Sequence, residues 1–445
     1  MANAEYLTNF SYIFIPFCLE KEEQFSDFSL ALNESGIWAP IDDEVRYLHR
    51  YVADRLIHGE DGKANLRHFR LSEAPAGLPR SIPYRRKYKT APKNFRGQKG
   101  LTFDFSIADV QLFSFNTSVG ILTFRLEFES NDPFEIAAAQ YYLRKISSER
   151  FYTVDEDGSE LSRNFIELSK LLLGELTERF SLDFFFYAAP KNERANFFTY
   201  VDCPKKDSVV EELFFLKWCY HDGFIFESES EESDAVNYDA DENKRWGISP
   251  SAAVCIVHRC EENRDFIENV FQKNFHRQYL LTYILLLHQK YMMYLFLTKM
   301  SVGIENDLAL LERYKRRLYE FETKYMFSKI SEVPQYQRFY EKIRHSFSLK
   351  EMFSDVQEPL SRLAEIQKQA EDERQKENEG RINSTLTVLS LLTIISAVTD
   401  ALGITANIPW LPENVTTVLP IVLAAGVLAL GGWLIVRLLL LKFKR

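Results

Sequence analysis

Two long apolar stretches near the C-terminal end dominate the hydrophobic pattern of the chain. From Ser384 to Ile404 the only charged residue is Asp400, and about 20 mostly apolar residues are what a helix needs to cross a hydrocarbon layer of about 30 Å. From Val415 to Leu441 the only charge is Arg437, which lies near enough to the end to reach the membrane surface. The pattern therefore predicts two transmembrane helices, at about 384–404 and 415–441, joined by a short turn.

Positive charges flank the two predicted spans on one side only. Arg374, Lys376 and Arg381 precede the first span, Lys442, Lys444 and Arg445 follow the second, and the turn holds no Lys or Arg. Because positive charges are enriched in cytoplasmic flanks, both termini are predicted to lie in the cytoplasm. The expected location is an inner (plasma) membrane that the chain crosses twice.

The two predicted spans differ in polarity. The second is rich in Leu, Val and Ala, whereas the first carries hydroxyl groups along its length. At about 100° per residue, one broad face of the first span collects the candidate pore-lining residues. They are Asn383, Thr387, Ser390, Thr393, Ile394, Ala397, Asp400 and Ala401. A polar stripe in a membrane favours a water-filled cavity or another helix, and one helix cannot enclose a pore, so this interpretation requires a symmetric oligomer.

Two alternatives apply to this stripe. The hydroxyls can bond their own backbone carbonyls or hold helices together, as Ser and Thr often do in membranes. Asp400 is the candidate metal-binding residue, because an intramembrane carboxylate is costly unless it serves a function. Its alternative is a position at the outer interface, already in water.

Upstream, the pattern switches between the alternation of strands and the periodicity of helices. Ser11–Phe17 is predicted as a strand, and alternation over Leu101–Ile107 and Val119–Phe128 predicts an antiparallel hairpin. The other predicted elements are helices over Arg46–Ile57, Pro133–Ser148, Arg163–Phe180 and Val209–Cys219 and strands over Phe184–Tyr187, Phe197–Val201 and Ala252–Val257. This mixture predicts an α+β or α/β cytoplasmic sensor domain over residues 1–260.

After Glu261 the chain is predicted to be almost wholly helical. Tyr279–Met300 is apolar, but its His, Gln and Lys residues would be costly in lipid, so a buried core helix is expected rather than a third span. From Pro359 to Ala401 the only helix breaker is Gly380, which predicts one helix of about 65 Å that enters the first span. Residues 261–382 are therefore expected to form a helical bundle and stalk, and residues 383–445 the transmembrane hairpin.

The composition narrows the class of protein. A net charge of −10 over 445 residues argues against a polymeric nucleic-acid partner. The cysteines show no paired spacing and are expected to be reduced. No phosphate-binding Gly-rich loop, nucleophile elbow or zinc signature is present, so we do not expect an enzyme. A membrane-anchored enzyme stays an alternative, because Arg338 and His345 have a spacing found in some ribonucleases.

One basic stretch stands out in this acidic chain. No acid lies between Glu73 and Asp104, and the candidate ligand-binding residues in this stretch are Tyr84, Arg85, Arg86, Lys87, Lys89 and Arg96. Guanidinium groups bind phosphate through two bonds and aromatic rings attract cations and bases, so an adenine-nucleotide second messenger is the candidate ligand. The alternative is a loop that pairs with the chain's own acids or lies near anionic lipid.

The turn between the spans carries Gly403-Ile404-Thr405 and then Leu411-Pro412-Glu413. It resembles the loop of CorA-type divalent-cation transporters, in which Gly-Met-Asn ends the first span and Met-Pro-Glu follows. The plan of the chain is similar too, with a large N-terminal domain, a long helix, two spans and a basic tail. The resemblance implies a homopentamer in which Gly403, Ile404, Thr405 and Glu413 lie at the pore mouth. Thr405 replaces the Asn that holds the hydrated metal in that family, which affects selectivity for Mg²⁺.

The resemblance implies a homo-oligomeric channel or transporter that its cytoplasmic domain gates. With the basic stretch, it is similar to the CRISPR-associated CorA-like effectors of antiviral defence, which answer a nucleotide second messenger. Alternatives are an ordinary divalent-cation transporter, with Mg²⁺ as transported or regulatory ion, and a membrane-anchored enzyme or non-conducting scaffold.

Overall fold

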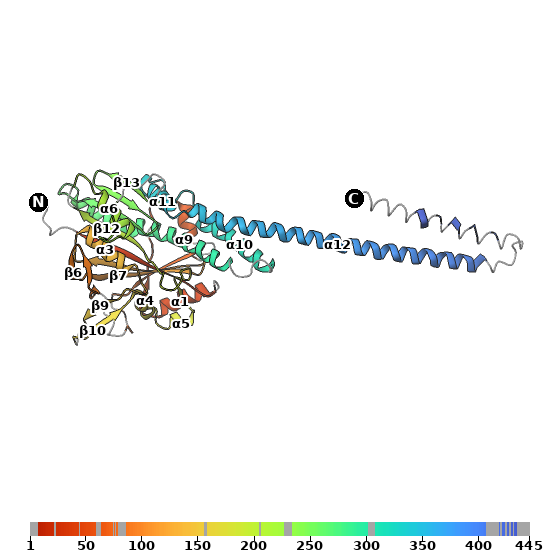
Figure 1. Cartoon of the computed structure of the whole chain (residues 1–445), viewed down its shortest axis with the longest axis horizontal. Coiled ribbons are helices and arrows are strands. Elements are labelled where there is room, and N and C mark those ends of the chain that lie inside the picture. Colours follow the sequence, from red (N-terminus) through yellow and green to blue (C-terminus); the bar gives the residue numbers. More distant parts are fainter. Residues whose placement is uncertain are drawn as a thin grey trace. The chain divides into compact units, whose positions relative to one another are not determined.

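The computed structural model describes residues 8–21, 24–43, 45–58, 64–73, 75, 77–78, 86–154, 158–203, 206–226, 234–300 and 308–405, and single positions between 418 and 433. The chain divides into two compact units, Met1–Leu360 and Ser361–Arg445. The first is an α+β unit built on a mixed sheet, and long helices follow the sheet in the sequence (Figure 1).

A 13-stranded sheet organises the described part of the first unit. Its strands are β1 (Asn9–Cys18), β2 (Trp38–Pro40), β3 (Leu66–Leu71), β4 (Lys87–Thr90), β7 (Asp104–Phe115), β8 (Val119–Phe128), β9 (Phe151–Val154), β10 (Glu160–Arg163), β11 (Asp183–Phe184), β12 (Asn196–Cys203), β13 (Val236–Asp241), β14 (Lys244–Ile248) and β15 (Ala252–His258). The main order is β10-β9-β4-β7-β8-β1-β12-β15-β14-β13, and β3 pairs with β2 and β7. β12 and β15 run parallel, whereas β1 is antiparallel to both of its long neighbours, so the sheet is mixed.

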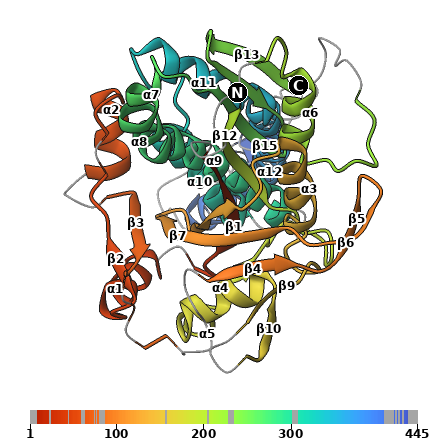
Figure 2. The same ribbon diagram turned by 90° about the vertical axis from the view of Figure 1, so that its left-hand side faces the viewer.

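Alternation along β1 shows how the sheet is covered on both faces. Ile13, Ile15 and Phe17 belong to the main core, to which α3 (Pro133–Leu143), α4 (Phe165–Leu173) and α6 (Val210–Trp218) contribute on the same face. In Figure 2, α3 lies beside α6. Tyr12 and Phe14 point the other way, where Phe14 meets Tyr283 of α9 (Leu280–Met300) at 5.2 Å between ring centroids. Helices therefore cover both faces of the central strands.

The second face is covered by one long irregular helix. It runs from Arg264 to Met300 through α7 (Arg264–Phe266), the π-helical turn η5 (Ile267–Phe271), α8 (Gln272–Asn274), the π-helical turn η6 (Phe275–Tyr279) and α9. Its most apolar window is 89% buried. Within α9, Gln289 Nε2 donates to the carbonyl oxygen of Tyr325 at 2.6 Å. The prediction of a buried core helix is confirmed.

Most predicted elements are present with shifted ends. The predicted hairpin is confirmed as β7 and β8, and Asp132 caps α3 by accepting a hydrogen bond from the Phe134 backbone N–H at 2.9 Å. The helix predicted over Arg163–Phe180 is divided into α4 and α5 (Leu176–Arg179), because Gly174 takes a φ of 56°. The strand predicted over Phe184–Tyr187 stops at Phe184, since Phe185 has a φ of 53°. These corrections lie where the backbone enters the left-handed region.

The helix predicted over Arg46–Ile57 begins later and changes type. It consists of α2 (Arg50–Ala53) and the π-helical turn η3 (Asp54–His58). The remaining described helices of this unit are α1 (Phe25–Glu34), α10 (Leu308–Tyr325) and α11 (Pro334–Ser346). The short strands β5 (Lys93–Phe95) and β6 (Gln98–Leu101) form a separate hairpin.

The helix α12 (Leu349–Thr405) contains the division between the two units. It confirms one continuous helix through the predicted stalk and into the first predicted span. Two helices of the described residues are long and apolar enough to cross a membrane, the buried Arg264–Met300 and the segment Leu349–Asp400 of α12, whose apolar window is not buried at all. The second predicted span lies mostly outside the described residues. Within this span, Gly431–Trp433 are described and are helical.

Candidate functional site

One narrow face of α12 is partly covered within the second unit. Its half-buried residues are Thr387, Leu391, Ile394 and Val398, which recur every three to four positions and so form one stripe. A Cβ atom added at Gly431 would lie 3.9 Å from Cγ2 of Ile394. The helical segment that contains Gly431 therefore contacts this stripe, the covered face of α12, at Ile394. Two predicted pore residues, Thr387 and Ile394, belong to it.

The other predicted pore residues lie beside the covered face. The described side chains of this exposed polar face are Asn383, Ser390, Thr393, Ala397 and Asp400. Large apolar residues elsewhere on the helix are also exposed, among them Val388, Leu392 and Ile395, each more than half exposed. Ala401, Gly403, Ile404 and Thr405 are the last residues of α12, and Glu413 lies outside the described residues.

Several hydroxyl groups of α12 bond the helix backbone. Thr387 Oγ1 donates to the carbonyl oxygen of Asn383 and Thr393 Oγ1 to that of Leu389, both at 2.7 Å. This geometry fits the alternative in which hydroxyls satisfy backbone carbonyls. A hydroxyl oxygen that donates its hydrogen still offers lone pairs to water or to a cation, so the bonds leave both interpretations of the stripe open.

Most described cations of the basic stretch have acidic partners. The ion pairs are Lys87 with Glu129, Lys89 with Glu160 at 3.3 Å, and Arg96 with Asp132 at 3.4 Å. Arg86 donates to the carbonyl oxygen of Val154 at 3.1 Å, whereas Tyr84 and Arg85 lie outside the described residues. These pairs match the alternative in which the stretch binds the chain's own acids, and they occupy the groups that a nucleotide phosphate would need.

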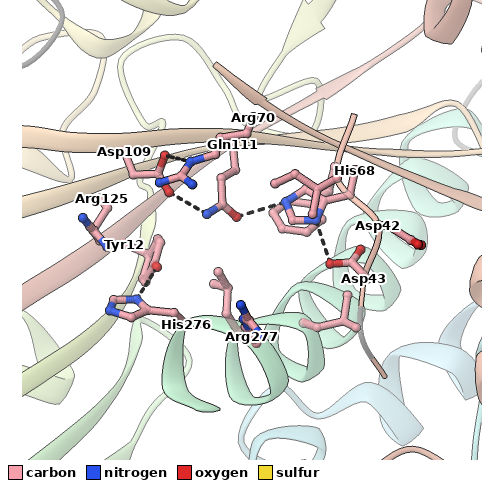
Figure 3. A pocket seen from close by; sticks show the side chains of 14 residues that line it. Tyr12, Asp42, Asp43, His68, Arg70, Asp109, Gln111, Arg125, His276 and Arg277 are labelled. Atoms are coloured by element: carbon pink, nitrogen blue, oxygen red, sulfur yellow. Dashed lines mark hydrogen bonds and ion pairs between the residues drawn. The ribbon is translucent and has the colours of Figure 1, made fainter. Parts of the chain in front are cut away.

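A cavity of about 390 Å³ lies elsewhere in the first unit, between the sheet and the start of α9. Its wall combines polar side chains from β1, β3, β7 and β8 with His276 and Arg277 of η6 (Figure 3). A volume of this size is at the lower end of the range for small-molecule sites.

The strand register explains why these polar side chains meet. Arg125 of β8 is paired directly with Tyr12 of β1 on one side and with Asp109 of β7 on the other. Directly paired residues point to the same face of a sheet. Between its pairs Ile107 with Leu126 and Asp109 with Arg125, β7 carries one extra residue. This β-bulge reverses the alternation, so that Ile107 and later Val110 belong to the core while Asp109 lines the cavity.

A chain of hydrogen bonds crosses one wall of the cavity. Asp43 Oδ1 and Gln111 Oε1 lie 2.8 and 3.0 Å from the two ring nitrogens of His68. Gln111 Nε2 donates to Asp109 Oδ2 at 2.7 Å, and Arg70 Nε donates to Asp109 Oδ1 at 2.7 Å. Because the bond to Asp109 fixes the orientation of the Gln111 amide, both ring nitrogens of His68 face acceptor oxygens.

The opposite wall holds a neutral histidine. Tyr12 Oη lies 2.6 Å from His276 Nδ1. Burial, followed by the nearby charge of Arg125, lowers the pKa of His276 to about 3, and burial raises the pKa of Tyr12 above its usual value. The Tyr12 hydroxyl therefore donates to Nδ1, and the remaining ring proton lies on Nε2. His276 lies in the π-helical turn η6, and such turns are frequent at functional sites.

The sequence reasoning missed this cavity. Its signal was present as isolated polar residues in otherwise apolar strands, such as Asp109 and Gln111 in β7 and Arg125 in β8. A polar residue inside a buried strand needs a partner. The partners are up to 264 positions apart in sequence, so no local pattern connects them.

Known proteins give no further guide to these sites. No protein-family model matches the chain, and no curated protein matches it either.

Among the described residues, no group of three or more His, Cys, Asp or Glu side chains is placed to hold a metal ion. Asp400 therefore lacks the additional ligands of a metal centre within the described part of one chain.

Proposed function

We propose that this chain forms a homo-oligomeric membrane channel or transporter whose conductance the first unit controls. The observation that supports it best is the surface of α12 between Asn383 and Asp400. There an exposed polar face lies next to the covered face, on a helix whose large apolar side chains are also exposed.

The proposal follows from the solvent that each face requires. Exposed apolar side chains such as Val388 and Leu392 are stable in lipid, whereas Ser390 and Asp400 are costly there. The helical segment at Gly431 leaves the exposed polar face open. Further copies of the chain would cover this face and enclose a water-filled path, with the resemblance to CorA-type transporters suggesting five copies.

The transported ion and the regulator follow from the same proposal. Asp400 from each copy would form a ring of carboxylates, and such rings favour cations. Mg²⁺ is one candidate, as in an ordinary divalent-cation transporter. The resemblance also suggests an effector that opens in response to an adenine-nucleotide messenger during antiviral defence.

Ion flux from liposomes that contain the purified full chain tests the proposal. Ser390→Leu blocks the exposed polar face, and Thr399→Leu is the matched control, since nine residues at about 100° each place Thr399 on the opposite side of the helix. We expect Ser390→Leu to lower flux about tenfold or more and Thr399→Leu to leave it nearly unchanged, with both proteins assembled as the wild type is by cross-linking.

Equal flux in both variants, or no flux from wild-type liposomes under any added ion or nucleotide, would contradict a pore. The first result would leave the hydroxyls as bonds to the helix backbone. The second would favour a non-conducting scaffold or a membrane-anchored enzyme.

A further inference from the structure

We propose that the cavity between the sheet and η6 is a binding site for a metabolite-sized ligand that carries a phosphate or carboxylate group. The site differs from the basic stretch between Glu73 and Asp104, most of whose described cations pair with acids of the chain. Its volume of about 390 Å³ accommodates a ligand of the size of a mononucleotide or a small dicarboxylic acid.

The guanidinium groups of the wall offer donors for an anion. Three guanidinium groups, of Arg70, Arg125 and Arg277, line the same space. Two of the wall's three carboxylates are already engaged, Asp109 by Arg70 and Gln111 and Asp43 by His68. Guanidinium groups offer planar pairs of N–H donors that match the two oxygens of a phosphate or carboxylate.

The wall is built to hold its cations in place. Asp109 is only 2% exposed, so its bond to the buried Gln111 is shielded from water, whereas the side chain of Arg70 is 44% exposed. Arg125 pairs through Nη2 with Glu127 at 3.4 Å, but its buried Nε donates no hydrogen bond among the described residues. A buried donor without an acceptor costs free energy, and an anionic ligand in the cavity would supply the acceptor.

The rest of the lining sets the shape of the ligand. Ile41, Phe113, Leu280 and Leu281 give the cavity an apolar side. A ligand that carries only charge would leave this side in contact with water. The combination of guanidinium groups and an apolar wall suits a molecule with an anionic end and an apolar or aromatic body, as most ligand sites combine the two kinds of contact.

Within the first unit, contacts of α9 connect the cavity to the start of α12. The inference that a ligand in the cavity acts on α12 rests on the proposed function. Leu280 and Leu281 begin α9, and further along α9 Tyr283 and Lys290 contact Phe347, with Lys290 Nζ 4.5 Å from the ring centroid. Phe347 directly precedes Ser348 and the start of α12. A ligand that shifts η6 would therefore move the helix that holds the first turn of α12.

Calorimetric titration of the purified full chain with adenosine monophosphate, adenosine and citrate tests the site. Adenosine is the matched ligand without the phosphate group, and citrate is the carboxylate ligand. We expect at least one of the two anions to bind, and adenosine to bind about tenfold more weakly than adenosine monophosphate if the phosphate is the recognised group. Binding of citrate alone would identify a carboxylate as that group.

Two variants locate the binding. Arg125→Gln removes the guanidinium beside Tyr12, and Arg277→Gln changes an exposed residue that lines the cavity. Arg50→Gln is the control, because Arg50 is 94% exposed on α2. We expect each cavity variant to weaken the anion about tenfold or more, as for the loss of a charge-assisted contact, and the control to bind as the wild type does.

Absence of binding for both anions, or binding that Arg277→Gln leaves unchanged, would overturn the site. This outcome is independent of ion flux. A chain that binds the anion but conducts nothing would refute the proposed function and keep the site, and a chain that conducts without binding either anion would do the reverse.

Discussion

The helix Arg264–Met300 and the segment Leu349–Asp400 of α12 pass the same test of length and apolar character, yet their surroundings are opposite. The apolar window of the first is 89% buried, and that of the second is not buried at all. In α9, His288, Gln289 and Lys290 are buried and contact groups of the same unit. The comparison teaches that apolar composition does not distinguish a core helix from a membrane helix, whereas the placement of the polar residues does.

The largest expected difference comes from a charge placed at matched leucines. Leu286 of α9 is 0% exposed and Leu389 of α12 is 54% exposed. Leu286→Asp buries a carboxylate without a partner and should cost more than about 5 kcal/mol, enough to unfold a domain of ordinary stability. Leu389→Asp should leave the first unit folded and weaken membrane insertion by about 3 kcal/mol.

Circular dichroism and limited proteolysis report the first effect, and extraction of the protein from membranes reports the second. A first unit that stays folded in Leu286→Asp would contradict the burial of Leu286 in the core.

The second prediction concerns the buried amine of α9. Burial and then the charge of Arg144 lower the pKa of Lys290 to about 7, against about 10.4 in an unfolded chain. Between these values the unfolded state holds a proton that the folded state has lost, so stability rises with pH by up to about 1.4 kcal/mol per unit. Below about pH 7 both states are protonated, and the full cost of burial is present.

Denaturant unfolding of the wild type and of Lys290→Met between pH 6 and 10 checks this sign. We expect the wild type to gain stability relative to the variant as the pH rises through this window. A difference between the two proteins that does not change with pH would show that Lys290 has an ordinary pKa.

Removing single hydrogen bonds should have a smaller effect on stability, which again differs between α9 and α12. Gln289→Leu leaves the buried carbonyl oxygen of Tyr325 without its donor and should cost about 1–3 kcal/mol of unfolding free energy. Thr393→Val removes only a bond to the carbonyl oxygen of Leu389, which stays bonded in the helix, and should change the thermal stability of the protein by less than about 0.5 kcal/mol. Comparable losses of stability in the two variants would mean that the hydroxyl groups of α12 contribute to the stability of the fold.

The smallest expected effect is a difference in the rate of cysteine labelling between two sides of α12, with stability unchanged. In a Cys260→Ser background, which removes the exposed cysteine, Ser390→Cys and Thr399→Cys place a thiol on opposite sides of the helix. A charged, membrane-impermeant maleimide should label Cys at 390 at least several-fold faster than at 399, because only a thiol in water ionises and reacts. Equal labelling rates in membranes would contradict a water-filled path along the exposed polar face.

Local sequence patterns were sufficient to predict many helices and strands of the chain. The hairpin of β7 and β8, the buried α9 and the continuous α12 follow from period, length and the cost of charge in lipid. Errors arose where one backbone angle decides, as at Gly174 and Phe185. A left-handed conformation at a residue such as Phe185 is imposed by its surroundings, and no preference of the residue indicates it.

The sequence by itself determined that helices and strands alternate over the first 260 residues and that an apolar helix with a polar stripe lies near the C-terminal end. Only the tertiary structure decided that several cations of the basic stretch meet acids of the chain and that Tyr12, Asp109 and His276 share a cavity. Periodicity is a property of neighbours in sequence, whereas a charge partner or a cavity depends on strand register, on one β-bulge and on residues up to 264 positions apart.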